Sequence, residues 1–487
     1  MKAMKYLMMG ALLMGFSMAA VAQTPTGTAA DVDAVKQLIK SNPADLGKKM
    51  KDFYKVNKKT PANIAAFGRA FLDVKDTVNA RAAAENLLKV AKEKIDKAAG
   101  YELLGDIAVI ASNPGLAGQN YELAILNNPD SPDAYTKYAV MYRAVSLQSS
   151  IAKLDELHAR RPDLPVEALK AHIYYISVQY GLAFKTYAGI PTSQLSRRDW
   201  VEYAYSAYAD KKYDKALEVI QQASQVVPNN ATLNRLGLYS AAELEKAKEA
   251  VAYADVLFNK VDKDSVTILD RDYVAWGRAL CADSLFQEGL EKFEMALKMN
   301  ADKEPSASAS IHEYMSDAYK GMNNFPKAIE EYQTFLGSLT EVEATDFSGL
   351  GVLYMGYART LTGDEQTAAL KKADQYFAEL IEKFPGKSDE YGTYQRARVN
   401  NSLDPTMEQG LAKPYFEKII ELVSAHETLS KTDKQRLESA YRYLLGYHNS
   451  ITKDKEQALL YAKKVQELAP GDNINALVES LSKSVGQ

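Results

Sequence analysis

Pairs of small residues recur along this chain with a fixed offset of 12 positions. The clearest pair joins Gly105 to Ala117, and an aromatic residue, Tyr121, follows four positions later. The same offset joins Gly68 to Ala80, Ala171 to Ala183, Ala204 to Ala216, Gly277 to Gly289, Ser316 to Ala328 and Gly446 to Ala458. Two antiparallel helices approach closely only where small side chains face each other. The offset therefore predicts helical hairpins with one small residue on each helix, and we expect the aromatic residue to fill the gap against the next hairpin.

The segments between these markers carry apolar residues at spacings of three and four, which is typical of amphipathic helices. Asn-Gly and Asp-Gly, the turn signals of β-hairpins, are absent from the sequence. A proline stands 12 positions after the second small residue at Pro129, Pro228, Pro385 and Pro470, where it would end the second helix. Ser196 with Asp199, and Thr267 with Asp270, have the spacing of capping boxes that begin helices. The sequence therefore predicts an all-α chain.

At this point the chain resembles the tetratricopeptide repeat (TPR) family. The residues that match its pattern nearly in full are Tyr101, Leu104, Gly105, Ala117, Tyr121, Ala124 and Pro129, and a second set is Trp200, Tyr203, Ala204, Ala216 and Pro228. Eleven units are marked by Ala80, Ala117, Ile151, Ala183, Ala216, Ala250, Gly289, Ala328, Ala373, Ala412 and Ala458. The resemblance covers most of residues 60–470. It implies a right-handed superhelical solenoid of about eleven hairpins with terminal capping helices.

Some units depart from the pattern. Ile151 replaces the small residue, and the unit from Gly237 to Ala250 carries one extra residue. The offset is 17 from Gly356 to Ala373 and 15 from Ala397 to Ala412. Longer helices or loops are expected in these units, and they leave the local pitch of the superhelix open.

The beginning of the chain has the features of a secretory signal peptide. Lys2 and Lys5 precede an apolar run, and Ala20-Val21-Ala22 before Gln23 forms a cleavage site. We therefore expect residues 1–22 to be removed between Ala22 and Gln23, and the protein to be exported to the periplasm or cell envelope without a membrane span. The predicted order of the remaining chain is capping helices at 23–58, the repeat array at 59–470 and a capping helix at 471–487.

Composition restricts the chemistry. The net charge of −4 argues against a nucleic-acid partner, which normally meets a basic face. The single cysteine, Cys281, has no intrachain disulfide partner, and the chain has no P-loop and no His-Glu-x-x-His motif. We therefore predict no cofactor, no metal and no catalytic residue. A less favoured alternative is an (α/α) toroid carbohydrate-active enzyme, which would need two carboxylates facing one sugar.

The TPR resemblance implies a concave surface lined by the first helix of each hairpin. Its positions select Arg69, Arg143, His172, Tyr175, Tyr205, Tyr208, Arg278, Tyr357, Arg398, Asn401, Tyr443 and Tyr447. Tyrosine and arginine dominate binding hot spots because they bury area while keeping polar groups. The prediction is a non-catalytic scaffold that binds a protein or peptide segment, with a glycan-binding or glycan-handling envelope protein as the alternative. The sequence specifies neither the partner nor the oligomeric state.

Three triplets have the order Asp, then Ser or Thr, then an aliphatic residue, which some gram-negative bacteria O-glycosylate in exported proteins. Their hydroxyl residues are Thr77, Ser265 and Ser284. All three fall in predicted turns, where a modifying enzyme could reach them.

Overall fold

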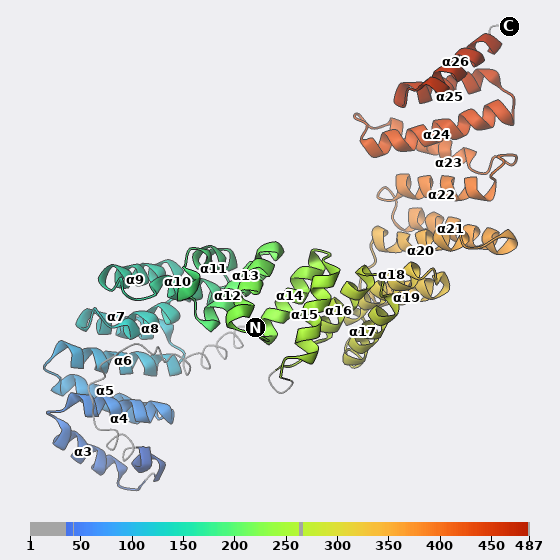
Figure 1. Ribbon diagram of the computed structural model, residues 1–487. Coiled ribbons are helices and arrows are strands. Elements are labelled where there is room, and N and C mark those ends of the chain that lie inside the picture. The colour runs from blue at the N-terminus through green and yellow to red at the C-terminus, as the bar shows by residue number, and fades with distance from the viewer. Residues whose placement is uncertain (1–35, 42, 263–265, 486–487) are drawn as a thin grey trace. The chain divides into compact units, whose positions relative to one another are not determined.

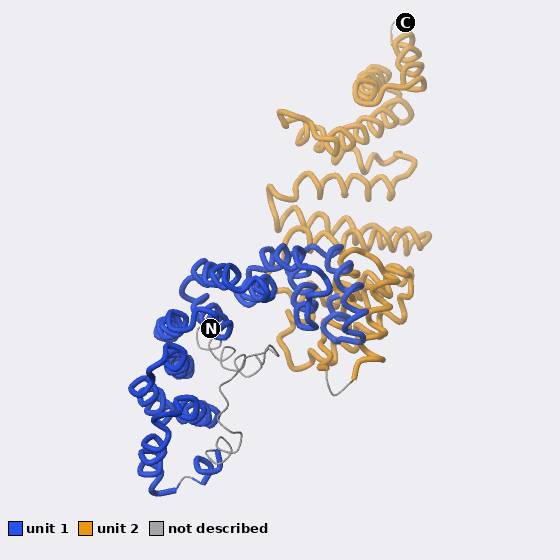
Figure 2. The backbone as a smooth tube through the Cα atoms, turned by 60° about the vertical axis from the view of Figure 1, so that its left-hand side comes forward, with its two compact units in different colours: residues 1–236 blue, residues 237–487 orange. Residues whose placement is uncertain are grey.

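The computed structural model describes residues 36–41, 43–262 and 266–485, and the regular elements in this part of the chain are helices (Figure 1). The predicted signal peptide at residues 1–22 and the candidate Ser265 lie outside it. The chain divides into two compact units, unit 1 up to Leu236 and unit 2 from Gly237 (Figure 2). Among the described residues, no helix combines the length and the apolar character needed to cross a membrane.

Unit 1 opens with a short helix at residues 36–41 and with α3 (Leu46–Asn57). Its hairpins are α4 (Pro61–Asp73) with α5 (Thr77–Val90), α6 (Lys94–Ile110) with α7 (Pro114–Asn127), α8 (Pro132–Tyr142) with α9 (Leu147–Arg160), α10 (Val166–Ile176) with α11 (Tyr180–Ala188), and α12 (Arg197–Ala209) with α13 (Tyr213–Val226). The short 3-10 helix η2 (Thr192–Gln194) precedes α12, and α14 (Ala231–Glu243) crosses the boundary between the units.

Unit 2 continues with α15 (Ala247–Asn259), the partner of α14. Its further hairpins are α16 (Asp270–Ala282) with α17 (Phe286–Met299), α18 (Ala309–Gly321) with α19 (Phe325–Ser338), α20 (Ala344–Ala358) with α21 (Gly363–Lys383), α22 (Asp389–Leu403) with α23 (Lys413–Ser424), and α24 (Lys431–Ser450) with α25 (Lys455–Leu468). The short 3-10 helix η4 (Pro305–Ala307) precedes α18, and α26 (Asp472–Val485) ends the described chain. The described residues thus form the eleven helical pairs that the sequence predicts.

The small residues lie where the two helices of a hairpin meet. The alanines predicted on the second helices are each 0% exposed, namely Ala80, Ala117, Ala183, Ala216, Ala250, Ala328, Ala373, Ala412 and Ala458. Ile151, which replaces the small residue in its unit, is half-buried. The aromatic residue four positions after the second small residue meets the next hairpin, as expected: ring centroids lie 5.9 Å apart for Phe293 and Tyr314, and 4.7 Å apart for Phe416 and Tyr443. It also packs against the first helix of its own hairpin. A Cβ atom added to Gly277 would lie 2.5 Å from Phe293 Cε1, and one added to Gly237 would lie 2.7 Å from Tyr253 Cδ1.

The turn inside most hairpins has a left-handed residue just after the first helix. These residues are Lys75, Ser112, Val178, Lys211, Glu245, Ser284, Asn323 and Lys453, with φ between 56° and 64°. In the turn after α10, the amides of Val178 and Gln179 donate to the carbonyls of Tyr175 and Tyr174 at 3.0 and 2.9 Å. This is the Schellman pattern, which satisfies the last carbonyls of a helix. The repeated turn explains why successive hairpins keep one geometry.

Side-chain caps fix several helix starts. The Ser196 hydroxyl accepts from the Asp199 amide at 3.2 Å while the Ser196 amide donates to the Asp199 carboxylate at 2.9 Å, so the predicted capping box is confirmed. The box predicted at Thr267 is displaced by two residues. There α16 begins at Asp270, and the Leu269 amide donates to the Asp272 carboxylate at 2.9 Å. The carboxylate supplies half of a capping box without a hydroxyl at the N-cap.

The cores lie between the helices of each unit and contain fully buried tyrosines. Tyr121, Tyr135 and Tyr187 are each 0% exposed. Their hydroxyls donate to carboxylates of Asp106, Glu156 and Glu202 at 2.7, 2.8 and 2.7 Å. A buried phenol needs a hydrogen-bond partner, and these bonds tie second helices to neighbouring ones. At the two ends, α3 packs Met50 against Phe67, and α26 packs Ile474 against the α25 apolar face.

Candidate functional site

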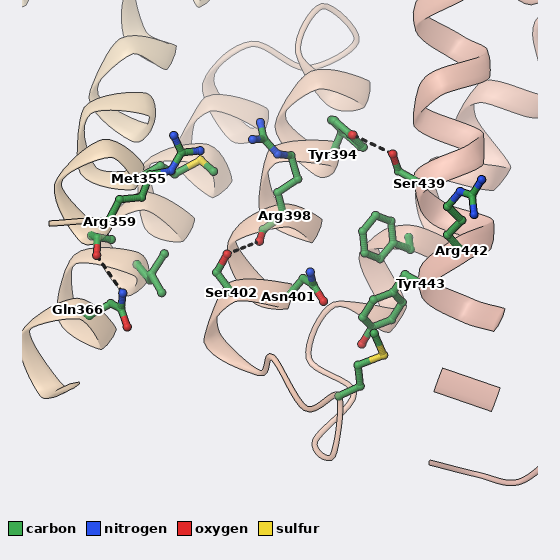
Figure 3. Close-up of a pocket in the computed structure, with 14 residues that line it drawn as sticks. Met355, Arg359, Gln366, Tyr394, Arg398, Asn401, Ser402, Ser439, Arg442 and Tyr443 are labelled. Atoms are coloured by element: carbon green, nitrogen blue, oxygen red, sulfur yellow. Dashed lines mark hydrogen bonds between the residues drawn. The ribbon is translucent and has the colours of Figure 1, made fainter. Parts of the chain in front are cut away.

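A pocket of about 510 Å³ opens in unit 2 along the first helices α20, α22 and α24 (Figure 3). We call it the α22 pocket. It is lined by Met355, Ala358, Arg359, Gln366, Leu370, Tyr394, Arg398, Asn401, Ser402, Met407, Phe416, Ser439, Arg442 and Tyr443. Three of the residues selected from the sequence, Arg398, Asn401 and Tyr443, therefore lie together in one cavity. Its volume is within the range of ordinary ligand pockets.

Three arginines give the α22 pocket its charge, and none of its lining residues is acidic. They come from successive first helices or their ends: Arg359 follows α20, Arg398 lies on α22 and Arg442 on α24 (Figure 3). Within the described chain Arg359 forms no ion pair, and Arg398 donates only to the Gln395 amide oxygen at 2.9 Å. Arg442 pairs with Glu438 of its own helix at 2.8 Å. The pocket therefore carries more positive charge than the protein around it balances.

Part of the lining of the α22 pocket is apolar, with contributions from Met355, Leu370, Met407 and Phe416. Asn401 lines the same pocket from α22, the helix that also carries Arg398 (Figure 3). Its Oδ1 atom is buried and has no hydrogen-bond partner among the described residues. A buried acceptor without a donor costs free energy until a water or ligand supplies one. The geometry thus combines cationic groups, an apolar surface and an acceptor that needs a donor.

The units with irregular spacing build the walls of the α22 pocket. In the unit with offset 15, the extra residues form a loop between α22 and α23, and the buried Asp404 carboxylate accepts from the Gln409 and Leu411 amides at 3.0 and 3.3 Å. This loop presents Met407 to the pocket. In the unit with offset 17, α21 starts early and brings Gln366, which donates to the Ala358 carbonyl at 3.0 Å. The departures from the repeat thus contribute Met407 and Gln366 to the lining of the cavity.

Hairpin geometry decides the fold family. A small residue on the first helix receives an aromatic ring 16 positions later, in Gly105 with Tyr121, Gly237 with Tyr253 and Gly277 with Phe293. This is the separation that the TPR pattern requires. The chain has a TPR fold.

Among known proteins, only solved structures resemble this chain, and they do so over part of its length. No protein-family profile and no curated protein matches the sequence. Solved TPR structures match in part. The C-terminal part of a TPR repeat-containing protein from Cytophaga hutchinsonii is 23% identical, over 56% of this chain and 96% of that chain, with a TM-score of 0.45. PilW, a type IV pilus biogenesis factor, is 17% identical over 45% and 93%, with a TM-score of 0.34. MamA is 18% identical over 37% and 97%, with a TM-score of 0.28.

In unit 1 of the TPR array, the selected tyrosines form an aromatic cluster. The Tyr205 ring lies 5.6 Å from Tyr175, 5.4 Å from Tyr180 and 6.5 Å from Tyr208, in edge-to-face contacts. Each of these side chains is half-buried. Burial raises the pKa of Tyr175 to about 12, so its hydroxyl stays neutral. The cluster therefore packs successive helices together, and its part in binding stays a prediction.

Of the basic residues selected in unit 1, Arg69 and His172 contact carboxylates of neighbouring first helices. Arg143 instead donates to the Val140 carbonyl of α8. Arg69 on α4 pairs with Glu102 and Asp106 on α6 at 3.3 and 3.7 Å, and Lys137 on α8 reaches Asp106 at 2.8 Å. The buried His172 on α10 contacts Glu202 on α12 at 2.8 Å. These contacts contrast with the α22 pocket, where the arginines lack carboxylates from other helices.

Arg278 and the remaining tyrosines lie elsewhere in unit 2. Arg278 pairs with Glu243 at 3.1 Å, lies over the Tyr314 ring and lines a second cavity of about 490 Å³. Cys281 lines the same cavity, and burial raises the pKa of its thiol to about 11. Tyr357 stacks on Phe325 with ring centroids 6.1 Å apart. Tyr447 stacks on Tyr443 at 6.4 Å, beside the α22 pocket.

The sequence does not reveal one cluster of ionisable side chains, because its members are far apart in the chain. Ligand atoms of Glu390, His426 and Asp433 lie within 4.8 Å of one another, a spacing that a metal ion could use. However, His426 Nε2 and Nδ1 already contact Glu390 and Asp433 at 2.7 and 3.2 Å, and Arg436 contacts Glu390 at 2.8 Å. The hydrogen bond to Asp433, then the one to Glu390, raises the pKa of His426. An imidazolium bridging two carboxylates explains this arrangement without a metal.

Proposed function

We propose that the protein is a non-catalytic TPR scaffold of the bacterial cell envelope that binds a protein or peptide segment. The α22 pocket is the observation that carries this proposal. It lies on the first helices, is large enough for several side chains, and holds cationic, apolar and hydrogen-bonding groups together. Its groups hold and orient a ligand, since charge-assisted hydrogen bonds from arginine combine strength with directional specificity.

The tryptophans support a peptide ligand over a glycan. Proteins that bind sugars by stacking need an exposed aromatic face, but Trp200 is 2% exposed. Trp276 packs its ring 4.6 Å from Phe258, and the Lys292 ammonium covers it at 4.5 Å. Both tryptophans are thus engaged in packing.

The proposal is tested by affinity capture with the mature chain. Immobilised wild-type protein is compared with a variant carrying Arg359→Ala, Arg398→Ala and Arg442→Ala, against an envelope extract read by quantitative mass spectrometry. A matched control carries Lys371→Ala, Lys372→Ala and Lys387→Ala, because these lysines are exposed in the same unit and lie outside the pocket lining. We expect a partner protein that the wild type and the control retain and the arginine variant loses. Equal capture by all three chains would contradict the proposed site.

A further inference from the structure

We propose that the α22 pocket recognises an acidic segment of a partner protein in which carboxylate side chains flank an apolar one. This inference rests on the proposed function and adds the chemistry of the ligand. It follows from the charge of the pocket, from its apolar lining residues and from Asn401, which each select a different part of such a segment.

The α22 pocket has an excess of positive charge. Arg359, Arg398 and Arg442 face a cavity without an acidic lining residue, although the whole chain has more acidic than basic residues. Several other cations on first helices meet carboxylates of adjacent helices, as Arg69 meets Glu102 and Arg396 meets Asp374. The second cavity, with Arg278, also contains Glu245 and Asp317 in its lining. The α22 pocket is therefore complementary to a ligand that brings its own negative charges.

The arginines and the apolar lining residues together determine which kind of anion fits the pocket. The planar guanidinium matches a carboxylate or phosphate through two parallel hydrogen bonds. An inorganic anion would leave the apolar lining residues Met355, Leu370 and Met407 in water, whereas an apolar side chain would cover them. The ligand thus carries carboxylates and an apolar group close together, as acidic peptide segments do.

Asn401 adds a hydrogen-bonding requirement to the pocket. Its buried Oδ1 lacks a donor within the described chain. A peptide backbone offers an N–H to such an oxygen and a carbonyl to the amide nitrogen, so one asparagine can pair with one peptide unit. A phosphate or sulfate at neutral pH offers mainly acceptors and would leave Oδ1 unpaired. The asparagine therefore favours a peptide over a lone anion.

The test measures binding of fluorescent synthetic peptides to the full mature chain by anisotropy. One peptide alternates glutamate with leucine, and matched peptides replace every glutamate by glutamine or by lysine. We expect the glutamate peptide to bind at least about tenfold more tightly than the glutamine peptide, and its affinity to fall with added salt. Equal binding of the glutamate and glutamine peptides would overturn the inference. So would full displacement by inorganic phosphate at a concentration equal to that of the peptide carboxylates.

Single substitutions show whether the glutamate peptide binds in the α22 pocket. Arg398→Glu should weaken the glutamate peptide at least about tenfold, because it reverses one charge in the pocket. Lys371→Glu makes the same change of charge at an exposed position outside the lining and should leave affinity within about twofold. Arg398→Gln removes the charge without adding a carboxylate, and a melting curve for each variant confirms folding. Equal losses in Arg398→Glu and Lys371→Glu would overturn the assignment to this pocket.

The two proposals fail in different ways. If no glutamate peptide binds while the captured partner still requires the three arginines, the acidic segment is wrong and the scaffold function stands. If capture does not depend on the arginines but the glutamate peptide requires Arg398, the acidic segment stands and the proposed function loses its site.

Discussion

Gly105 on α6 lies under the ring of Tyr121 on α7, so that a Cβ atom on Gly105 would come within 2.6 Å of Tyr121 Cδ1. The ring is fully buried, and its hydroxyl is held by Asp106 at 2.7 Å. It therefore has no free direction in which to move. The close approach of the two helices depends on the missing side chain.

The first prediction is that Gly105→Ala destabilises unit 1 by about 1–3 kcal/mol through overpacking. Urea unfolding followed by circular dichroism measures the change. Gly337→Ala is the control, because Gly337 has nothing within 4 Å of the added Cβ and lies near the end of α19. That substitution should gain about 0.5–1 kcal/mol from helix propensity. A Gly105→Ala protein as stable as the control would show that the contact tolerates a methyl group.

This pair also shows what the sequence could predict. The offset of 12 between small residues located the hairpins, because close helix packing has a strict requirement for residue size. The expected contact of the aromatic ring with the next hairpin is confirmed, as Phe293 stacks on Tyr314. The spacing did not reveal the second contact of these rings, with the first helix of their own hairpin. The cap at Ser196 was right and the one at Thr267 was displaced, because Asp272 can hold the Leu269 amide without a hydroxyl.

The candidate site was only partly predictable, for a physical reason. Arg398, Asn401 and Tyr443 follow from the position of the first helices. Met407 and Gln366 belong to irregular insertions, where no repeat pattern applies. Whether an arginine is paired also depends on contacts between helices: Arg69 and Arg398 occupy first helices alike, but only Arg69 meets carboxylates of a neighbouring one.

A second prediction concerns the hairpin turn after α10. Val178 has φ of 62° and is 66% exposed, and a β-branched residue is strained in this region of backbone space. Val178→Gly should therefore raise stability by about 0.5–1 kcal/mol, which thermal unfolding can measure. Val145, an exposed valine in the turn between α8 and α9, is not among the left-handed residues. Val145→Gly should instead lower stability by a similar amount, because glycine adds freedom to the unfolded chain.

A third prediction is a pH dependence that His426 creates. Its pKa is raised in the folded protein by Asp433 and Glu390, so the contribution of His426 to stability is fully present below its unfolded pKa of about 6.5. It is lost as the pH rises through the higher folded pKa. The nearby Arg436 is charged throughout this range and adds no titration.

Melting temperatures measured from below about pH 6.5 to above the folded pKa of His426 test the role of this residue. The difference between wild type and His426→Gln should be largest at low pH and shrink as the pH rises. His158→Gln is the control, because His158 is exposed and has no hydrogen bond or ion pair among the described contacts. A difference between wild type and His426→Gln that does not change with pH would assign His426 a packing role only.

A fourth prediction concerns modification in the native host. Ser284 is exposed in the left-handed turn between α16 and α17, whereas Thr77 is half-buried at the first position of α5. If the predicted O-glycosylation occurs, Ser284 should be occupied to a greater extent than Thr77. Intact mass and peptide mapping measure both, with Ser284→Ala as the reference. An unmodified intact mass would dismiss the triplets as sites.

The last prediction concerns Tyr205, which has been a candidate for binding and whose ring contacts Tyr175, Tyr180 and Tyr208. Tyr205→Ala removes these contacts, and we expect unit 1 to lose about 2–4 kcal/mol. Tyr205→Phe keeps the ring and should stay within about 1 kcal/mol of wild type. The double variant Tyr205→Ala with Tyr208→Ala should lose less stability than the sum of the losses in the two single variants, because the two rings touch.

The same variants separate packing from binding. Tyr205→Phe is folded by this expectation, so its affinity for a captured partner reports the hydroxyl alone. If the phenol binds the partner, affinity should fall by about 0.5–1.5 kcal/mol without a change in melting temperature. Unchanged affinity in Tyr205→Phe, together with a large stability loss in Tyr205→Ala, would make the aromatic cluster a structural core. Binding would then be concentrated at the α22 pocket, where the arginines are exposed and their replacement changes charge without removing packed rings.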